Sequence, residues 1–509
     1  ITHGGDGFES AVDPKNPDIV YAQSQYGGLS RYDKKSGEEV GIQPKERKGE
    51  ANYRWNWDAP LLVSRHKDGR VYFAANKVFR SDDRGNSWDV ISDDLSQQID
   101  RNKLKVMGRV WGIDAVSKNG STSPFGSVVA LAESPVDENL LYAGTDDGLI
   151  QVTENGGQSW RKQQNFPGVP TMTYVNYVLP SQHDAGVVYA AFNHHKYGDF
   201  KPYIYKSSDK GVSWTSITAN LPVKGTVYSI AEDHVDPNLL FAGTEYGIFF
   251  TNDGGKSWKQ LKAGMPTIAI KDIDIQRREN DLVLASFGRG FFVLDDYSAL
   301  RQLGQATLAK DGALFPIRNA LAYEESMPLG LPGKAFQGDD YYAAENLGPV
   351  AIFTWYLRDE VKTKEEVRRE AEKKQFENNQ DSAYPSYEAL KEEKQEPDPY
   401  LLFTIRDSQG NIVRKLQTKP VKGVNRTTWD LRYAPKTPIS LNKPSFYNAF
   451  AGKEEGHLVV PGRYTVQLSK SVDGSFATLS EEVPFEVVPL QNTVLPAANR
   501  SAMVVFKNE

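Results

Sequence analysis

Short runs of β-branched and aromatic residues, separated by glycine-containing turns, fill the first 300 residues of the chain. Residues 136–152 (VDENLLYAGTDDGLIQV) and 235–251 (VDPNLLFAGTEYGIFFT) are nearly alike, and related runs begin near residues 12, 68 and 280. Runs of Val, Ile, Leu, Tyr and Phe of this length favour strands over helices. The pattern therefore predicts a series of antiparallel hairpins and an all-β fold.

A turn motif, [ST]-x-[DN]-x-G-x-S-W, occurs at residues 81–88, 153–160, 207–214 and 251–258. The Asp or Asn side chain is expected to accept backbone N–H bonds within the turn, and the Gly to adopt a conformation that other residues resist. The Trp is expected to pack against the neighbouring unit while its N–H finds an acceptor. The predicted structural residues are Asp83, Gly85, Trp88, Asn155, Gly157, Trp160, Asp209, Gly211, Trp214, Asp253, Gly255 and Trp258.

The spacing of the motif predicts a β-propeller. The third and fourth copies begin at residues 207 and 251, which matches the ~40 to 45 residues of a four-stranded blade. Six blade-like units can be counted in residues 1–297, and a polar insertion at 92–125 explains the longest interval. We therefore expect a six- to seven-bladed propeller over residues 1–300, in which the first and last units lack the turn motif.

The pattern changes after residue 300, which indicates a second domain. Residues 301–345 include a Pro/Gly-rich stretch and are expected to form a connector. Strand-like segments with turn signals in residues 346–490 predict an immunoglobulin-like β-sandwich, followed by a tail at 491–509. A charged insertion at about 360–397 is expected to be a helical or partly disordered surface excursion.

Composition excludes several classes of function. Sixty Lys and Arg stand against 66 Asp and Glu and are scattered, so no nucleic-acid partner is expected. The absence of Cys excludes disulfides, thiolate metal sites and a cysteine nucleophile. No run approaches the ~18 apolar residues of a membrane span, and no phosphate-loop or dinucleotide motif occurs, so we expect neither a span nor a cofactor.

The four turns resemble Asp boxes, the bacterial neuraminidase repeats (BNR) of sialidases, xyloglucan-type glycosidases and sortilin. The longer run AEDHVDPNLLFAGTEYGIFFTNDGGKSW resembles a family of large secreted bacterial proteins described as sortilin-like or glycosyl hydrolase-like. Members of that family are about twice this length, so the resemblance implies that this chain is the second half of a secreted or cell-surface protein whose signal peptide lies elsewhere. A protein partner, or the missing N-terminal propeller half, is then expected to bind it.

Candidate site residues come from the loops between the second and third strands of the blades, which meet at one mouth of a propeller channel. The ligand-binding candidates are Tyr26, His194, His195, Lys196, Asp199, Tyr246 and Arg289. Asp146 or Asp147 with Glu245 could form a glycosidase pair, which needs carboxyls ~5 to 5.5 Å or ~6.5 to 9.5 Å apart. The alternative is that these carboxylates are solvated or paired with cations.

Two further features carry alternatives. His194 and His195 would need a third ligand, such as Asp199, to hold a metal, and adjacent side chains of a strand point to opposite faces, so no metal site is expected. Tyr53, Trp55 and Trp57 alternate and are expected to share one strand face, as core packing, a sugar-stacking platform or a protein interface.

These observations favour an extracytoplasmic binding and interaction scaffold at a bacterial cell surface, within a larger assembly or a longer polypeptide. Carbohydrate is a possible ligand. The alternative is a glycoside hydrolase that acts on a polysaccharide and shares its cleft with the missing half. Sialidase chemistry is disfavoured, because Arg289 is the only arginine on the inferred rim and a sialidase needs an arginine cluster.

Overall fold

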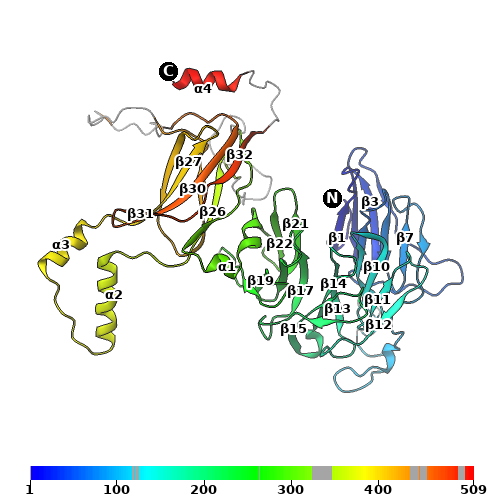
Figure 1. The fold of residues 1–509 in the computed structure, drawn as a ribbon. Coiled ribbons are helices and arrows are strands. Elements are labelled where there is room, and N and C mark those ends of the chain that lie inside the picture. Colours follow the sequence, from blue (N-terminus) through cyan, green and yellow to red (C-terminus); the bar gives the residue numbers. More distant parts are fainter. Residues whose placement is uncertain are drawn as a thin grey trace. The chain divides into compact units, whose positions relative to one another are not determined.

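The computed structural model describes residues 2–116, 118, 120, 125–262, 264–323, 347–435, 446, 455–490 and 499–508. It divides into two compact units, residues 1–297 and 298–509 (Figure 1). Across the described ranges, none of the helices combines the length and the apolar character that a bilayer span requires.

The first unit consists of six antiparallel sheets, and in each sheet the strands follow one another in chain order. Five sheets have four strands and the sixth has three. The first three sheets comprise β1 (Gly7–Val12), β2 (Ile19–Ser24), β3 (Gly28–Asp33) and β4 (Glu39–Gly41); β5 (Leu61–Val63), β6 (Val71–Ala74), β7 (Val78–Ser81) and β8 (Asp89–Val90); and β9 (Val128–Ser134), β10 (Asp137–Thr145), β11 (Ile150–Thr153) and β12 (Arg161–Gln163). The last three comprise β13 (Tyr174–Pro180), β14 (Val188–His194), β15 (Asp199–Ser207) and β16 (Thr215–Ser216); β17 (Val227–Glu232), β18 (Leu240–Thr244), β19 (Gly247–Thr251) and β20 (Lys259–Gln260); and β21 (Ile270–Gln276), β22 (Asp281–Ser286) and β23 (Phe291–Leu294).

The first strands of consecutive sheets lie side by side, from β1 through β5, β9, β13 and β17 to β21. They line a common channel, and the sheets pack face to face around it. In the middle sheets this packing covers both faces of a strand, so that every residue of β18 is buried. The all-β propeller predicted from the hairpin pattern is confirmed, with six sheets in the described residues.

The repeated turns connect neighbouring sheets. The Asp83 carboxylate accepts hydrogen bonds from the Ser87 amide (2.9 Å) and hydroxyl (2.6 Å), which close the turn. The Trp88 indole N–H then donates to the Ile42 carbonyl, next to the outermost strand of the preceding sheet (2.7 Å). The indoles of the copies at 153–160 and 251–258 donate to Ile91 and Ile217 in the same way. Each of these turns therefore satisfies its own polar groups and one carbonyl of the neighbouring sheet.

The copy at 207–214 differs in one respect. The Trp214 indole N–H donates to the Gly211 carbonyl within the same turn (3.2 Å). Its ring still packs against the preceding sheet. It meets Phe166, shortly after β12, edge to face with ring centroids 5.8 Å apart. The apolar contact between units is thus kept although the hydrogen bond is local.

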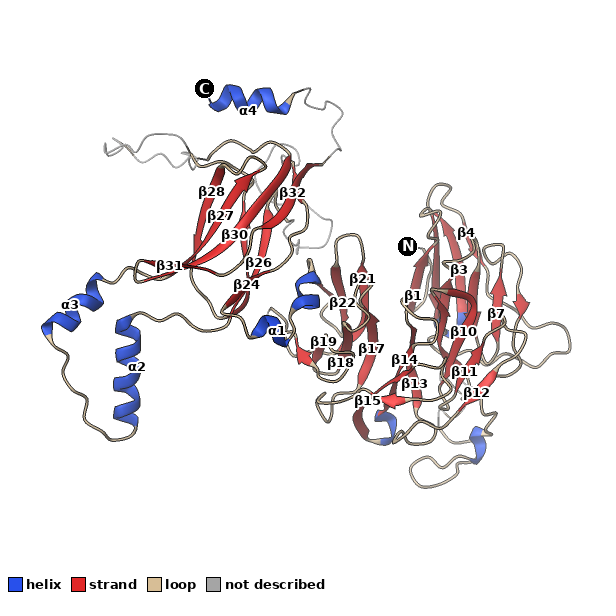
Figure 2. Cartoon of the chain, in the orientation of Figure 1, coloured by secondary structure: helices blue, strands red, loops and turns tan. Residues whose placement is uncertain are grey.

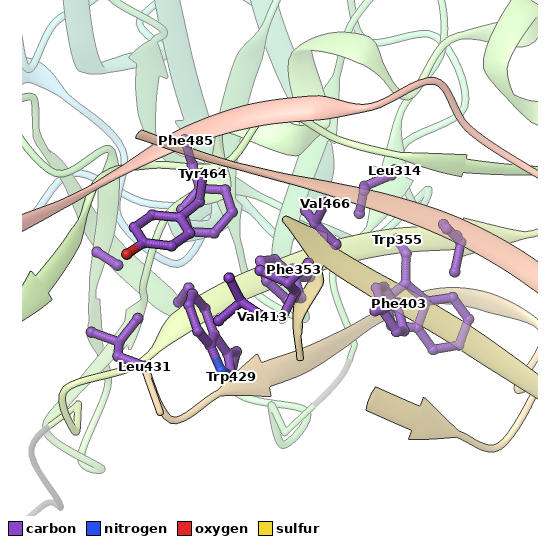
Figure 3. Packing of buried hydrophobic residues seen from close by; sticks show 14 of the residues in the cluster. Leu314, Phe353, Trp355, Phe403, Val413, Trp429, Leu431, Tyr464, Val466 and Phe485 are labelled. Carbon is purple, nitrogen blue, oxygen red and sulfur yellow. The ribbon is translucent and has the colours of Figure 1, made fainter. Parts of the chain in front are cut away.

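The second unit is a sandwich of two sheets. One contains β24 (Gly312–Leu314), β26 (Ala351–Leu357) and β29 (Gly423–Trp429); the other contains β25 (Ala320–Ala322), β32 (Val483–Pro489), β30 (Gly462–Val472), β27 (Tyr400–Asp407) and β28 (Ile412–Thr418), with β31 (Ser475–Thr478) paired to β30. Aromatic side chains from both sheets fill the space between them (Figure 3). Phe353 stacks on Phe403 across that space with ring centroids 5.8 Å apart.

The segments expected to surround the sandwich are partly described. The charged insertion forms the helices α2 (Lys364–Glu377) and α3 (Tyr387–Gln395), drawn in blue in Figure 2. Residues 301–323 were expected to belong to the connector. They instead contain the end of the short helix η4 (Tyr297–Gln302), the helix α1 (Gln305–Leu308) and the strands β24 and β25. Residues 324–346 of the connector and 491–498 of the tail lie outside the described residues, and α4 (Arg500–Asn508) follows.

The turn glycines provide a test of how tightly the sheets pack. Gly255 has φ +92°, and a Cβ there would lie 2.8 Å from Ile217 Cβ of the preceding sheet. Gly49 has the same φ of +92° but no atom within 4 Å of a Cβ. Gly49→Ala should cost ~1 kcal/mol of unfolding free energy from backbone strain alone, whereas Gly255→Ala should cost ~3 kcal/mol because overpacking adds to it. Urea unfolding of both variants measures the difference, and equal losses would contradict tight packing at the turn.

Candidate functional site

A cavity of about 1530 Å³ opens at the channel mouth on the side of the loops between second and third strands. Aromatic rings, carboxyl groups and lysines share its wall. The aromatic members are Trp57, Phe125, Tyr174, Tyr177, Tyr197 and Tyr228; the acidic members are Glu9, Asp58, Asp146 and Asp272; and the lysines are Lys105, Lys196 and Lys271. All of these residues belong to the first unit.

Irregular pairing in the first strands directs many of these side chains into the cavity. The register of β13 against β14 shifts between Val175 and Tyr177, and both Asn176 and Tyr177 line the cavity. A similar shift in β21 lies at Lys271, and both Lys271 and Asp272 line it. A bulge breaks the strict alternation of side chains and re-aims one of them. Neighbouring residues of an inner strand can therefore serve the same site.

Asp146 is the one predicted carboxylate that lines the cavity. Its Oδ1 accepts from the amides of Gly126 (3.0 Å) and Ser127 (2.8 Å), and its Oδ2 accepts from the Ser127 hydroxyl (3.0 Å). Burial, together with the nearby charge of Asp147, raises the pKa of Asp146 to about 6 despite these hydrogen bonds. The carboxyl is thus firmly positioned and changes its charge close to neutral pH.

Asp147 and Glu245 do not line the cavity. Asp147 is fully buried, and its carboxylate accepts from the Gln97 amide (2.7 Å) and the Thr145 hydroxyl (2.6 Å). Glu245 is exposed and accepts a hydrogen bond from the Tyr228 hydroxyl. The sequence placed these carboxylates in loops of two non-adjacent blades at one end of the channel, but Asp147 instead holds Gln97 of the 92–125 insertion against its sheet.

His194, His195 and Lys196 all lie on the cavity wall. The His194 ring stacks on Tyr197 with centroids 4.4 Å apart, and its Nδ1 is 3.0 Å from the Thr173 hydroxyl. Burial lowers the pKa of both histidines, and the charges of Lys196 and Lys271 lower that of His195 further. Both imidazoles are therefore expected to be neutral at pH 7, as hydrogen-bonding groups. Among the residues described, no cluster of three or more His, Asp or Glu side chains suits a metal ion.

Asn193 places an unsatisfied acceptor at the cavity. The residue is 5% exposed, and its Nδ2 donates a hydrogen bond to the side-chain Oδ1 of Asn176 (2.6 Å). In the described part of the chain, the Asn193 Oδ1 and the His195 Nδ1 are buried and have no hydrogen-bond partner. A buried polar atom left without a partner costs ~1 to 3 kcal/mol. A ligand that supplies a donor to Asn193 would recover part of that cost.

The remaining predicted ligand residues lie away from the cavity wall. Tyr26 supports the wall from behind, because its ring meets Trp57 edge to face at 4.9 Å. The Asp199 carboxylate accepts from the Tyr203 hydroxyl (2.6 Å). Tyr246 and Arg289 are exposed on turns of the last two sheets.

The three aromatic residues at 53–57 lie in two environments, the core and the cavity wall. Tyr53 and Trp55 are buried in the core of the first two sheets, and Trp55 stacks on Phe79 at 5.6 Å. Trp57 lines the cavity instead. The prediction that the three rings share one face of a strand is wrong, because residues 51–58 form an irregular segment rather than a strand. Alternation in the sequence therefore did not place the three rings on one side.

The site also contains residues that the sequence did not single out. These are chiefly Glu9, Asn56, Asp58, Tyr174, Asn176, Tyr177, Tyr228, Lys271 and Asp272. Most lie on the first strand of a sheet, next to the channel. The position of each first strand was readable from the repeat, but the bulges that aim adjacent residues into the cavity leave no sequence signal.

Fold and cavity together define a β-propeller with a ligand-sized cavity at its channel mouth. No family model matches the chain. It is 24% identical over 294 residues to xyloglucanase Xgh74A of Acetivibrio thermocellus, covering 51% of this chain and 31% of the relative, and 22% identical over 289 residues to a xyloglucanase of Paenibacillus sp., covering 51% and 26%. The chain thus spans about a third of the length of these relatives or less. Among solved structures, an ancestral GH74 enzyme is similar over 57% of this chain and 36% of its own, with 17% identity and a TM-score of 0.40.

The position of Asp146 generates a pH prediction. Its pKa of about 6 in the folded chain lies above the ~3.9 of an unfolded Asp, so the folded state binds the proton more tightly. This carboxyl should therefore stabilise the fold below pH ~4 and lose that contribution as pH rises toward 7. The loss should be ~2 kcal/mol, since partial access to solvent weakens it. Asp146→Asn should flatten this part of the profile in urea unfolding at pH 4.5 and 7, and parallel profiles would contradict the assignment.

Proposed function

We propose that this chain is an extracytoplasmic binding propeller of the sortilin-like, Asp-box type at a bacterial cell surface, and that its channel-mouth cavity binds a polysaccharide. The observation that carries the proposal is the unsatisfied Asn193 Oδ1 in a cavity walled by aromatic rings. Sugars present both complementary surfaces, apolar ring faces and hydroxyl donors. The similarity to xyloglucanases makes xyloglucan the first ligand to test.

The aromatic wall is held in place by its neighbours. Trp57 packs edge to face against Tyr26 at 4.9 Å and Phe8 at 6.4 Å. Lys271 lies over the Tyr228 ring, 3.3 Å from its centroid, so that ring is covered by a cation. Trp57 is therefore the ring best prepared to stack on a sugar, because its support orders it before a ligand arrives.

The polar groups select a ligand rich in donors. The carboxyl of Asp146 and the amide oxygen of Asn193 are acceptors. Both residues line the cavity, and the Asn193 oxygen is buried just behind its surface. A volume of about 1530 Å³ exceeds the ~300 to 1000 Å³ of ordinary small-molecule sites. The cavity therefore has room for several sugar rings of an oligosaccharide rather than for one.

Calorimetric titration with xyloglucan oligosaccharides tests the proposal. Trp57→Ala should weaken binding at least ~10-fold through loss of the stacking surface, and Asn193→Ala should weaken it ~5- to 10-fold through loss of one acceptor. Tyr246→Ala is the matched control, since this exposed aromatic residue lies outside the cavity wall and should leave affinity unchanged. No binding by the unaltered chain, or equal losses for Trp57→Ala and Tyr246→Ala, would refute the proposed site.

Glycoside hydrolysis is a second candidate, favoured by the carboxyls around the channel. Desolvation by the surrounding strands, helped by the negative charges of Asp58 and Asp272, raises the pKa of Glu9 to about 7. Desolvation by neighbouring protein atoms also raises the pKa of Asp58 and of Asp272, although both side chains are exposed. A carboxyl that keeps its proton near neutral pH can act as a general acid while another, ionised carboxylate acts as base or nucleophile.

Release of reducing ends from xyloglucan separates the two candidates. A hydrolase should lose at least ~100-fold in kcat in both Glu9→Gln and Asp146→Asn, because one variant removes the proton donor and the other removes the base or nucleophile. Their oligosaccharide affinity should change far less than kcat. A chain that binds the oligosaccharide but releases no reducing ends would support the binding scaffold, and activity unaffected by either variant would contradict this assignment of the carboxyls.

A further inference from the structure

The sixth sheet of the propeller is covered on one face only. In the middle sheets the second strands are buried on both faces, as in β14, where every residue from Val188 to Asn193 is buried. In the sixth sheet, β22 alternates between buried and half-exposed residues, and β23 alternates between exposed and half-exposed ones. A strand with period-2 burial has one face without a neighbour.

The uncovered face of the sixth sheet is apolar. Phe291 is 78% exposed and Val293 is 55% exposed, and these residues alternate along β23. Phe287, at the end of β22, is 70% exposed. On the first sheet, Val12 of β1 is 52% exposed. Large exposed apolar groups on neighbouring strands mark a surface that another element covers.

The sixth and the first sheet border the same gap in the ring of sheets. Successive first strands pack together from β1 to β21, whereas the described residues show no comparable packing between β21 and β1. The gap therefore continues a series of sheet-to-sheet interfaces that the first unit already repeats between each pair of neighbouring sheets.

We propose that a further antiparallel sheet of the same polypeptide, from outside residues 1–509, fills this gap as a seventh blade and covers Phe291 and Val293 with an apolar face. The repeated interface argues for a sheet rather than a helix or loop, because the open faces have the same alternating strand pattern that other sheets cover. The sixth sheet also ends at β23 with three strands, where the other five have four. A separate strand of the inserted segment can pair with that free edge while the sheet itself packs on the face.

Thiol labelling compares residues 1–509 with the full-length polypeptide that the gene encodes. The chain has no Cys, so Val293→Cys introduces a single thiol in residues 1–509. Its labelling by a maleimide, followed peptide by peptide in a mass spectrometer, should be at least ~10-fold slower in the full-length polypeptide. Val223→Cys is the control, because Val223 is 76% exposed on the loop before β17 and should react equally in both. Equal rates at position 293 in the two proteins would overturn the proposal.

Photocrosslinking identifies the occupant. A benzophenone side chain at position 291 replaces a residue that is already 78% exposed, so residues 1–509 should fold unchanged, with a Tm within ~2 °C. In the full-length polypeptide the crosslink should join residue 291 to a peptide outside residues 1–509 of the same molecule. A crosslink to residues 1–509 of a second copy would instead show a dimer interface and overturn the proposal, as would the absence of any crosslink.

Discussion

Face-to-face packing of neighbouring sheets is the constraint on which the propeller depends. A four-stranded sheet in a middle position has both faces buried, so each sheet needs a neighbour on either side, and five such interfaces order six sheets around a channel. The repeated turns reinforce this packing, because three of the four donate a Trp N–H to a carbonyl of the preceding sheet. The glycine in the turn lets the two backbones approach, as the 2.8 Å between a Cβ at Gly255 and Ile217 shows.

The same packing creates the candidate site. Because the first strand of each sheet lies along the channel, side chains from β1, β13, β17 and β21 meet at one mouth although they are distant in sequence. Bulges in these strands add neighbouring residues to the wall, and the loops between second and third strands contribute Asp146 and the histidines. The result combines stacking surfaces with buried acceptors, which is the chemistry a sugar chain requires.

Much of the fold was predictable from the sequence, and less of the site. Four copies of an eight-residue turn, with strand-like segments between them, indicate the propeller. A repeat of ~40 to 45 residues is the length of one four-stranded unit. The loops carrying Asp146, His194 and His195 were expected at one channel mouth, since they occupy equivalent positions in the repeat, and these residues line one cavity. Glu9 and Lys271 were not found, because their roles depend on strand bulges and on the closeness of first strands, and neither feature is encoded in a local pattern.

Asp147 and Trp57 are two residues whose side-chain directions could not be predicted from sequence spacing. Asp147 follows Asp146 directly, yet the tight turn sends one carboxylate to the cavity and the other into hydrogen bonds with Gln97 and Thr145. Trp57 alternates with Trp55, yet an irregular backbone separates the cavity ring from the core ring. Sequence spacing predicts side-chain direction only where the backbone is regular.

A crystal structure of the chain soaked with a xyloglucan oligosaccharide would show whether the channel-mouth cavity binds sugar. We expect a sugar ring stacked on Trp57, with a hydroxyl donating a hydrogen bond to the Asn193 Oδ1. An oligosaccharide bound elsewhere on the propeller, or a cavity that stays empty at saturating ligand, would contradict it.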